Sequence, residues 1–274
     1  MSEAMFNKDT QLCISLAAKP SNFGMIVHNA GYRALKLNYL YKAFGISDPA
    51  GALAGVRALG IRGCSISMPF KEQVVALLDA IDPAAASIGA VNTVVNTVGV
   101  LKGYNTDAYG AQVIIGKLGI PAIAPVLVLG AGGVARAILY ALETLGFRSI
   151  TLANRSIERF DTFEAAKKHR LVQWSERNTV PCSFLINCTS IGMPPDTDTA
   201  PVDLCMLDQC QAVMDVVVSP RDTRLIGAAR AKGKSVVSGY QMSLHQAIRQ
   251  FELYTGKQPP ENVMEQAVKS YLHS

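Results

Sequence analysis

The stretch Pro125–Arg136, PVLVLGAGGVAR, decides the fold of this chain. Four apolar residues, Val126–Leu129, run directly into a group of glycines, and good helix formers follow from Val134 onward. A short buried strand, a glycine turn and a helix are the parts of a dinucleotide-binding βαβ unit. Gly130 permits a tight turn, and Gly132 lets the backbone approach a pyrophosphate without a Cβ in the way. The N-terminus of the helix then offers free N–H groups and a partial positive charge to phosphates.

The same pattern also fits a plain glycine turn between a buried strand and a buried helix, so the neighbouring sequence has to decide. Ala135 fits the third position of the motif, where a small residue allows close packing of helix and strand. The candidate cofactor-binding residues of this loop are Gly130, Ala131, Gly132, Gly133, Val134 and Ala135.

The residues that follow the next strand indicate whether the cofactor is NAD or NADP. Ser149–Leu152 follows about twenty residues after the glycines, where NAD-dependent enzymes place an acidic residue for the ribose. This chain has Asn154 and Arg155 there instead. Without a carboxylate to repel a 2′-phosphate, and with a guanidinium to pair with it, NADP is favoured over NAD. The alternative for Arg155 is an ordinary solvated arginine.

Composition limits the classes of function. The chain has 274 residues, 49% of them hydrophobic and 17% charged, which suits one large or two ordinary globular domains. A net charge of +5 is spread along the chain and not clustered, so we expect small anionic ligands and no nucleic-acid surface. No apolar stretch is suited to a membrane span, and Met1–Asp9 has no signal-peptide core.

The six cysteines do not have the spacing of a zinc site. None forms a CxxC pair and no histidine cluster accompanies them, so we expect no metal. Several lie in apolar runs as small hydrophobic residues, which favours a reducing, cytoplasmic location.

Strand-like and helix-like segments alternate along the whole chain. Strands are expected at 10–16, 38–44, 61–68, 91–95, 100–104, 149–152, 184–187, 213–218 and 235–238. Helices are expected at 21–35, 49–59, 70–81, 105–118, 157–168, 223–232, 243–254 and 261–272. This alternation predicts an α/β protein with mostly parallel sheets, and we place the join between its domains within 105–118.

A candidate acid–base pair is formed by Lys71 and Asp107. Lys71 follows Ser67-Met-Pro-Phe in what is expected to be the first turn of a helix, an unusual place for a cation. Lysine and aspartate at the ends of elements are usable general acids and bases. Each residue alone is equally compatible with a solvated charge, and their spacing does not show that they pair.

Several segments together resemble the shikimate dehydrogenase family. In chain order, they are SMPFK (67–71), GAVNT (89–93), YNTDAYG (104–110), GAGGVAR (130–136), NRS (154–156), NCTSIGM (187–193) and GYQMSLHQA (239–247). They cover nearly the whole chain, and jointly they are far more specific than the glycine loop alone.

The resemblance implies two α/β domains with a cleft between them, the second a Rossmann-type NADP-binding domain. The substrate-binding domain would be 1–107, completed by C-terminal helices at 241–274, with the cofactor domain at 108–240. The implied reaction is the reversible NADP-linked reduction of 3-dehydroshikimate to shikimate, by a cytoplasmic enzyme that is a monomer or homodimer.

By motif position, the resemblance also implies roles for individual residues. Lys71 would be the acid–base with Asp107 as its partner. Ser21, Ser67, Asn92 and Gln246 would contact the substrate. The remaining cofactor contacts would be Asn154, Arg155, Thr189, Ser190, Met193 and Gly239.

The chain also departs from the family pattern in the substrate region. Ser21 fits the first of two family serines that bind a carboxylate, but Phe23 stands in place of the second, and Val218 replaces a tyrosine. Ser65 stands where the family has an asparagine. These changes resemble the shikimate dehydrogenase-like branch. His28 is expected to be a core or capping residue.

Two alternatives stay open at this point. The first is a dehydrogenase of quinate or another cyclic hydroxy acid, and the second is a nucleotide-binding regulatory protein without turnover. The retained Lys71 and Asp107 favour an enzyme, since a sensor has no need for an acid–base pair.

Overall fold

The computed structural model describes residues 6–273, which divide into two compact units. The first unit contains the chain up to Thr106 and again from Gln246 onward, and the second contains Asp107–His245. The chain passes from one unit to the other inside two helices, α4 (Thr106–Gly116) and α7 (Gly239–Thr255). In the described part of the chain, no helix combines the length and apolar character needed to cross a membrane.

The first unit is built on a mixed sheet with the strand order β2-β1-β3-β5-β6-β4. Its strands are β1 (Gln11–Ala17), β2 (Tyr39–Gly45), β3 (Gly63–Ile66), β4 (Ala80–Ile81), β5 (Thr93–Thr97) and β6 (Val100–Tyr104). β1 runs parallel to β2 and β3, whereas β5 is antiparallel to β3 and β6. The expected hairpin is therefore confirmed, and it makes this sheet mixed instead of mostly parallel.

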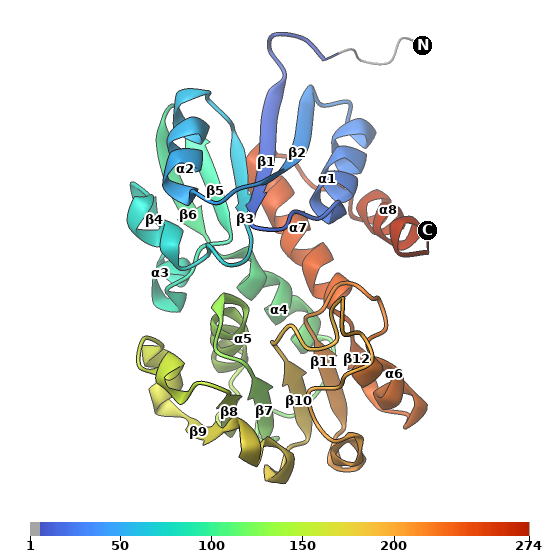
Figure 1. Ribbon diagram of the computed structural model, residues 1–274. Coiled ribbons are helices and arrows are strands. Elements are labelled where there is room, and N and C mark those ends of the chain that lie inside the picture. Colours follow the sequence, from blue (N-terminus) through green and yellow to red (C-terminus); the bar gives the residue numbers. More distant parts are fainter. Residues whose placement is uncertain (1–5, 274) are drawn as a thin grey trace. The chain divides into compact units, whose positions relative to one another are not determined.

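Helices cover both faces of this first sheet (Figure 1). On one face, α2 (Pro49–Ala58), α3 (Pro83–Ile88) and the 3₁₀ turn η1 (Gln73–Leu77) close an aliphatic core. On the other lie α1 (Phe23–Ala34), α8 (Glu261–His273) and the end of α7. Close contact there depends on glycine: a Cβ at Gly63 would come within 2.3 Å of the Tyr254 ring.

The second unit contains a parallel sheet with the order β12-β11-β10-β7-β8-β9. Its strands are β7 (Val126–Leu129), β8 (Ile150–Asn154), β9 (Arg170–Gln173), β10 (Phe184–Asn187), β11 (Ala212–Asp215) and β12 (Ser235–Val237). α5 (Gly133–Thr144) packs on one face, and α6 (Arg224–Ala231) packs on the other with the 3₁₀ turn η5 (Leu204–Gln209). All strand neighbours in this sheet are parallel, so their carboxyl ends share one edge. The predicted α/β class, with a Rossmann-type unit, is confirmed.

The helix predicted at 70–81 is wrong. The chain there forms turns, η1 and the short strand β4. The carbonyl of Lys71 accepts a hydrogen bond from the Val91 amide at 2.8 Å, and the Asp79 amide donates to the Leu101 carbonyl at 3.1 Å. Pairing with neighbouring segments therefore uses backbone groups that a helix would need.

The helix predicted at 157–168 is also wrong. It is replaced by two 3₁₀ turns, η2 (Ile157–Phe160) and η3 (Glu164–Lys168). The Thr162 carbonyl between them accepts from Arg136 Nη1 at 2.8 Å, and the Arg136 guanidinium lies 4.7 Å from the Phe163 ring centre. Phe160 and Phe163 are both buried, three residues apart, which is the spacing that a 3₁₀ turn stacks on one side.

Candidate active site

The glycine loop in the second unit has the geometry that the sequence predicted. β7 ends at Leu129, and Gly130 turns the chain with a φ of +111°, a conformation that side chains disfavour. Gly132 is the N-cap of α5, and a Cβ built on it would meet nothing within 4 Å. The helix N-terminus is therefore open to an approaching anion. Ala131 and Ala135 are buried beside the loop.

A cavity of about 360 Å³ lies next to this loop. It is lined by Ala131, Gly132, Asn154, Arg155, Ser156 and Arg159. The Asn154 side chain donates to the Ser156 carbonyl at 2.8 Å, which shapes the turn after β8. Within residues 6–273, neither Arg155 nor Arg159 forms an ion pair, so both guanidinium groups are available to a phosphate.

A second loop, Asn187–Met193, follows β10 at the same edge of the sheet. Thr189 is half-buried, Ser190 is exposed and Met193 is half-buried. The loop lies against the glycine turn, because a Cβ at Gly130 would come within 3.1 Å of the Cys188 carbonyl. Gly239 is buried at the start of α7 in this unit.

In the first unit, Asn92 and Gln246 are brought together across a long sequence separation. Asn92 Nδ2 donates to Gln246 Oε1 at 3.1 Å and to Thr106 Oγ1 at 3.0 Å. Asn92 Oδ1 accepts from the Thr106 amide at 2.7 Å and from the Thr93 hydroxyl at 2.8 Å. Asn92 is 1% exposed and fully hydrogen-bonded, so a substrate contact there competes with bonds already made within the protein.

Backbone hydrogen bonds fix the positions of Ser67 and Lys71 in the same unit. The Ser67 amide donates to the Leu16 carbonyl at 2.9 Å, which extends the pairing of β3 with β1. The bond from the Val91 amide to the Lys71 carbonyl places the Lys71 backbone next to the segment that contains Asn92, just before β5. Lys71 lies in a turn and not in the first turn of an α-helix, so the helix-terminus argument for its chemistry is wrong.

The remaining positions singled out in the sequence lie in other elements of the two units. Asp107 is the second residue of α4, is 7% exposed and belongs to the second unit. Ser21 is exposed in the loop before α1. Phe23 is the first residue of α1 and is 8% exposed, and Val218 is half-buried after β11.

The substrate region contains a group of hydroxyls that the motif positions did not reveal. Tyr41 is 1% exposed, and the side chains of Ser65 and Ser15 lie near its hydroxyl. Burial raises the pKa of Tyr41, so it is a neutral hydrogen-bonding group. A Cβ at Gly24 would come within 2.9 Å of the Tyr41 ring, so only a glycine lets α1 lie this close.

Gln250 links these hydroxyls to the histidine that the sequence left without a role. Gln250 Nε2 donates to Thr93 Oγ1 at 2.8 Å and to Ser65 Oγ at 3.2 Å, while its Oε1 lies 3.3 Å from His28 Nε2. His28 is buried and stacked 4.4 Å from Tyr41, as expected for a core residue. Burial lowers the pKa of His28 to about 4, so its imidazole is neutral.

Sequence reasoning missed Arg159 and Gln250 in particular. Arg159 lines the same cavity as Arg155 and stands four residues after it, and this spacing was the available signal. Gln250 stands four residues after Gln246, on the same side of α7. No group of three or more histidine, cysteine, aspartate or glutamate side chains suited to a metal occurs in the part of the chain that the structure describes.

Comparison with known proteins agrees with this arrangement. Residues 22–94 match the shikimate dehydrogenase substrate-binding domain, and residues 239–269 match the shikimate 5′-dehydrogenase C-terminal domain. A shikimate dehydrogenase-like protein from Haemophilus influenzae is 40% identical over 96% of this chain and 97% of its own length. A shikimate dehydrogenase (NADP(+)) from Moorella thermoacetica is 40% identical over 90% of this chain and 88% of its own.

Solved structures point the same way. Shikimate 5-dehydrogenase from Thermus thermophilus, in complex with NADP(H) and shikimate, superposes with a TM-score of 0.83 at 32% identity, covering 95% of this chain and 99% of its own. Identity of this extent over nearly full length, together with a glycine loop and an arginine-lined cavity in the second unit, establishes the relationship. The chain belongs to the shikimate dehydrogenase family.

Proposed function

We propose that this protein is an NADP-dependent oxidoreductase that interconverts 3-dehydroshikimate and shikimate. The observation that carries the cofactor is the cavity beside the glycine loop, lined by Arg155 and Arg159 and without a carboxylate. Two guanidinium groups at the end of β8 suit the 2′-phosphate that distinguishes NADP from NAD. The related enzymes from Moorella thermoacetica and Thermus thermophilus support the same cofactor.

The residues that would hold the cofactor follow from the second unit. Gly132 and the N-terminus of α5 bind the pyrophosphate, and Arg155 and Arg159 bind the adenosine phosphate. Thr189, Ser190, Met193 and Gly239 belong to the two segments assigned to the nicotinamide half. When bound, the cofactor would carry the hydride, which NADPH gives up in reduction and NADP⁺ accepts in oxidation, and the protein would orient it against the reacting carbon.

Lys71 and Asp107 are proposed as the acid–base pair of the reaction. Lys71 accepts the hydroxyl proton of shikimate during oxidation and returns it during reduction, and Asp107 keeps the ammonium group in place. Support for Lys71 comes from its backbone hydrogen bond with Val91, the residue before Asn92. Support for Asp107 comes from its motif position, directly after Thr106, whose amide is held by Asn92.

Short polar side chains in the first unit would recognise the hydroxyls of the substrate. Asn92, Gln246 and Ser67 occupy the family positions for this role, and Asn92 already positions Gln246. A site that hydrogen-bonds each hydroxyl strongly rejects analogues that lack one. With Phe23 at a position where the family binds a carboxylate, and Val218 in place of a phenolic donor, we expect weaker binding of shikimate than in relatives that carry serine and tyrosine.

The decisive experiment is a dehydrogenase assay of the purified protein with shikimate and NADP, followed by the absorbance of NADPH. Reduction of NADP that depends on shikimate supports the proposal. Turnover of quinate in preference to shikimate would contradict the proposed substrate and support a quinate dehydrogenase instead. Binding of NADP without turnover of any cyclic hydroxy acid would replace it with a regulatory role.

A further inference from the structure

The second unit contains a buried carboxylate that the proposed reaction does not use. Asp215 is the last residue of β11 and is 0% exposed. No lysine, arginine or histidine within residues 6–273 forms an ion pair with it. A buried charge without a counter-charge is strongly unfavourable unless hydrogen bonds compensate it. The hydrogen bonds of Asp215 therefore indicate what it does.

Three donors from three separate segments converge on this carboxylate. Asn187 Nδ2 at the end of β10 donates to Oδ1 at 3.0 Å, and the Val217 amide donates to the same oxygen at 3.0 Å. The Thr223 hydroxyl, at the N-cap of α6, donates to Oδ2 at 2.7 Å. All three segments lie at the edge of the sheet formed by the carboxyl ends of its strands, where the glycine loop also lies.

Asn187 passes this restraint on to the loop after β10. Its Oδ1 accepts from the Thr189 amide at 3.0 Å and from the Thr189 hydroxyl at 2.7 Å. The Ile191 amide then donates to Thr189 Oγ1 at 3.2 Å. Thr223 also touches this loop, since a Cβ at Gly192 would lie 3.4 Å from its methyl group. One carboxylate thus holds two residues, Asn187 and Thr223, that contact the loop 188–193.

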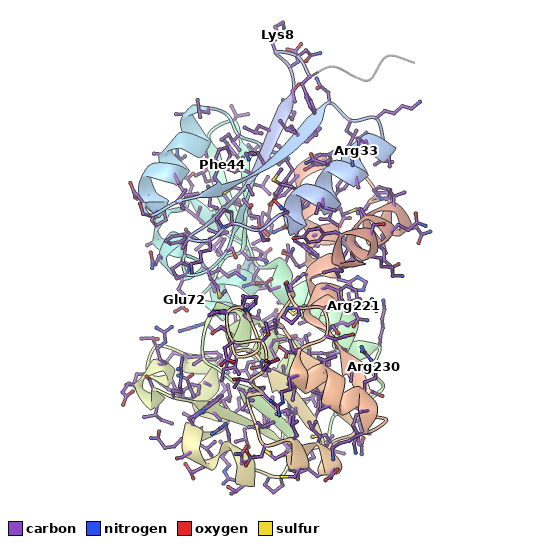
Figure 2. The ribbon with its side chains drawn as sticks, turned by 45° about the vertical axis from the view of Figure 1, so that its right-hand side comes forward. Lys8, Arg33, Phe44, Glu72, Arg221 and Arg230 are labelled. Carbon is purple, nitrogen blue, oxygen red and sulfur yellow. The ribbon has the colours of Figure 1, made fainter. Side chains whose placement is uncertain are left out.

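The segment after β11 transmits the restraint to the start of α7. A Cβ at Gly239 would come within 2.3 Å of the Val217 carbonyl, so the first turn of α7 rests directly on this segment. Arg221, labelled in Figure 2, lies 5.7 Å from the ring centre of Tyr240, the next residue of α7. The position of Gly239 therefore depends on the backbone that Asp215 fixes.

We propose that Asp215 is the positioning residue for the nicotinamide half of the cofactor site. It holds Thr189 through Asn187, Gly192 through Thr223 and Gly239 through Val217, and it contacts neither cofactor nor substrate. This inference rests on the proposed NADP-dependent function. The adenine half of the site, with Arg155 and Arg159, lies at β8 and does not share these hydrogen bonds.

The test compares two ligands on one variant by calorimetry. Adenosine 2′,5′-bisphosphate carries adenosine with its 2′- and 5′-phosphates and lacks the nicotinamide half, whereas NADP reaches both halves. Asp215→Asn keeps the shape but places an amide donor against Asn187 Nδ2 and removes the charge. We expect NADP to bind about tenfold more weakly or worse, while adenosine 2′,5′-bisphosphate binds unchanged. Amide hydrogen exchange in 188–193 should become faster in the unliganded variant.

The matched control is Asp208→Asn in the same unit. Asp208 forms an ion pair with Lys232 at 2.6 Å but its side chain is 68% exposed. This variant should bind both ligands as the wild type does. Equal weakening of both ligands by Asp215→Asn, or no weakening of either, would overturn the role of Asp215. A wild-type protein that binds neither ligand would instead overturn the proposed cofactor, and the inference with it.

A second pair of variants keeps the test decisive if Asp215→Asn does not fold. Thr223→Val removes one donor to Asp215 at nearly constant shape, and Thr223→Ser retains it. The valine variant should weaken NADP selectively, and the serine variant should restore its affinity. The exchanged pair Asn187→Asp with Asp215→Asn keeps one carboxylate and one amide, so it should bind NADP better than Asp215→Asn alone. Failure of both rescues would contradict the proposal.

Discussion

Arg155 is the residue on which cofactor choice most directly depends. It lies in the cavity beside the glycine loop, where a 2′-phosphate would meet it. Losing a hydrogen bond to a charged group costs about 1.5–3 kcal/mol, so Arg155→Ala should weaken NADP by that amount and leave NAD nearly unchanged. Fluorescence titration with both cofactors measures this. Arg159→Ala should show the same selectivity, and an equal loss for NAD would show that neither arginine discriminates.

Lys71 and Asp107 should control turnover and not cofactor binding. A general acid–base contributes roughly 10²–10⁴-fold to rate, so Lys71→Met should lower kcat by that factor with little change in NADP affinity. Asp107→Asn should act in the same direction. If the two residues work as one unit, the double variant should lose less than the product of the single losses. Wild-type turnover in Lys71→Met would mean that another group moves the proton.

Phe23 and Val218 should weaken the use of shikimate. Phe23 replaces a hydroxyl where the family binds a carboxylate, and Val218 removes a phenolic donor; each missing bond to a charged group costs about 1.5–3 kcal/mol. We expect a high KM for shikimate in the wild type, and a lower KM at similar kcat in Phe23→Ser with Val218→Tyr. A low-micromolar KM in the wild type would instead indicate that the hydroxyls of Ser15 and Ser65, beside Tyr41, already bind the carboxylate.

At the scale of elements, two glycines in the β7–α5 turn should affect different properties, one the stability of the fold and the other cofactor binding. Gly130 has a φ of +111°, and a Cβ there would approach the Cys188 carbonyl to 3.1 Å. Gly130→Ala should therefore lower the free energy of unfolding by about 1–3 kcal/mol. Gly132 has a φ of −84° and open space around it, so Gly132→Ala should fold normally. It should nevertheless weaken NADP, because the methyl group occupies the path of the pyrophosphate. Urea unfolding and cofactor titration of both variants separate the two effects.

Some elements of the fold could be predicted from the local sequence and others could not. The β7–α5 unit was predictable because strand, turn and helix are local, and each glycine has a local reason. The segment 70–81 was not, although Phe70, Val74, Leu77 and Leu78 have helical spacing. Its backbone bonds go to Val91 and Leu101, which no local pattern reveals.

The candidate site divides in the same way. Residues in contiguous motifs, such as Asn154 and Arg155, were found from their place after a strand. Gln250 and Asp215 were not, because their meaning lies in partners from distant segments: Gln250 bonds Ser65 and Thr93, and Asp215 bonds Asn187. A buried polar residue becomes informative only when its donors and acceptors are known.

At the scale of the whole molecule, each unit contains a buried titratable group, and their effects on stability have opposite signs. Burial lowers the pKa of His28 in the first unit to about 4, from an ordinary value of 6.5. The unfolded chain binds this proton more readily, so stability falls as pH decreases from about 6.5 to 4. Burial raises the pKa of Asp215 in the second unit to about 6, from an ordinary value of 3.8. There the folded state binds the proton more readily, so stability falls as pH increases from about 3.8 to 6.

The contributions of His28 and Asp215 to the pH dependence of the free energy of unfolding can be separated by mutation. Each group contributes at most about 1.4 kcal/mol per pH unit, and between pH 4 and 6 the contributions oppose each other. His28→Gln should remove the loss on acidification, and Asp215→Asn should make that loss steeper. The measurement is the free energy of urea unfolding at several pH values, read as a slope so that the stability lost to the mutation itself cancels. If the units unfold in two separate transitions, His28→Gln should change only the transition of the first unit and Asp215→Asn only that of the second. Unchanged slopes in both variants would mean that neither group titrates differently in the folded protein.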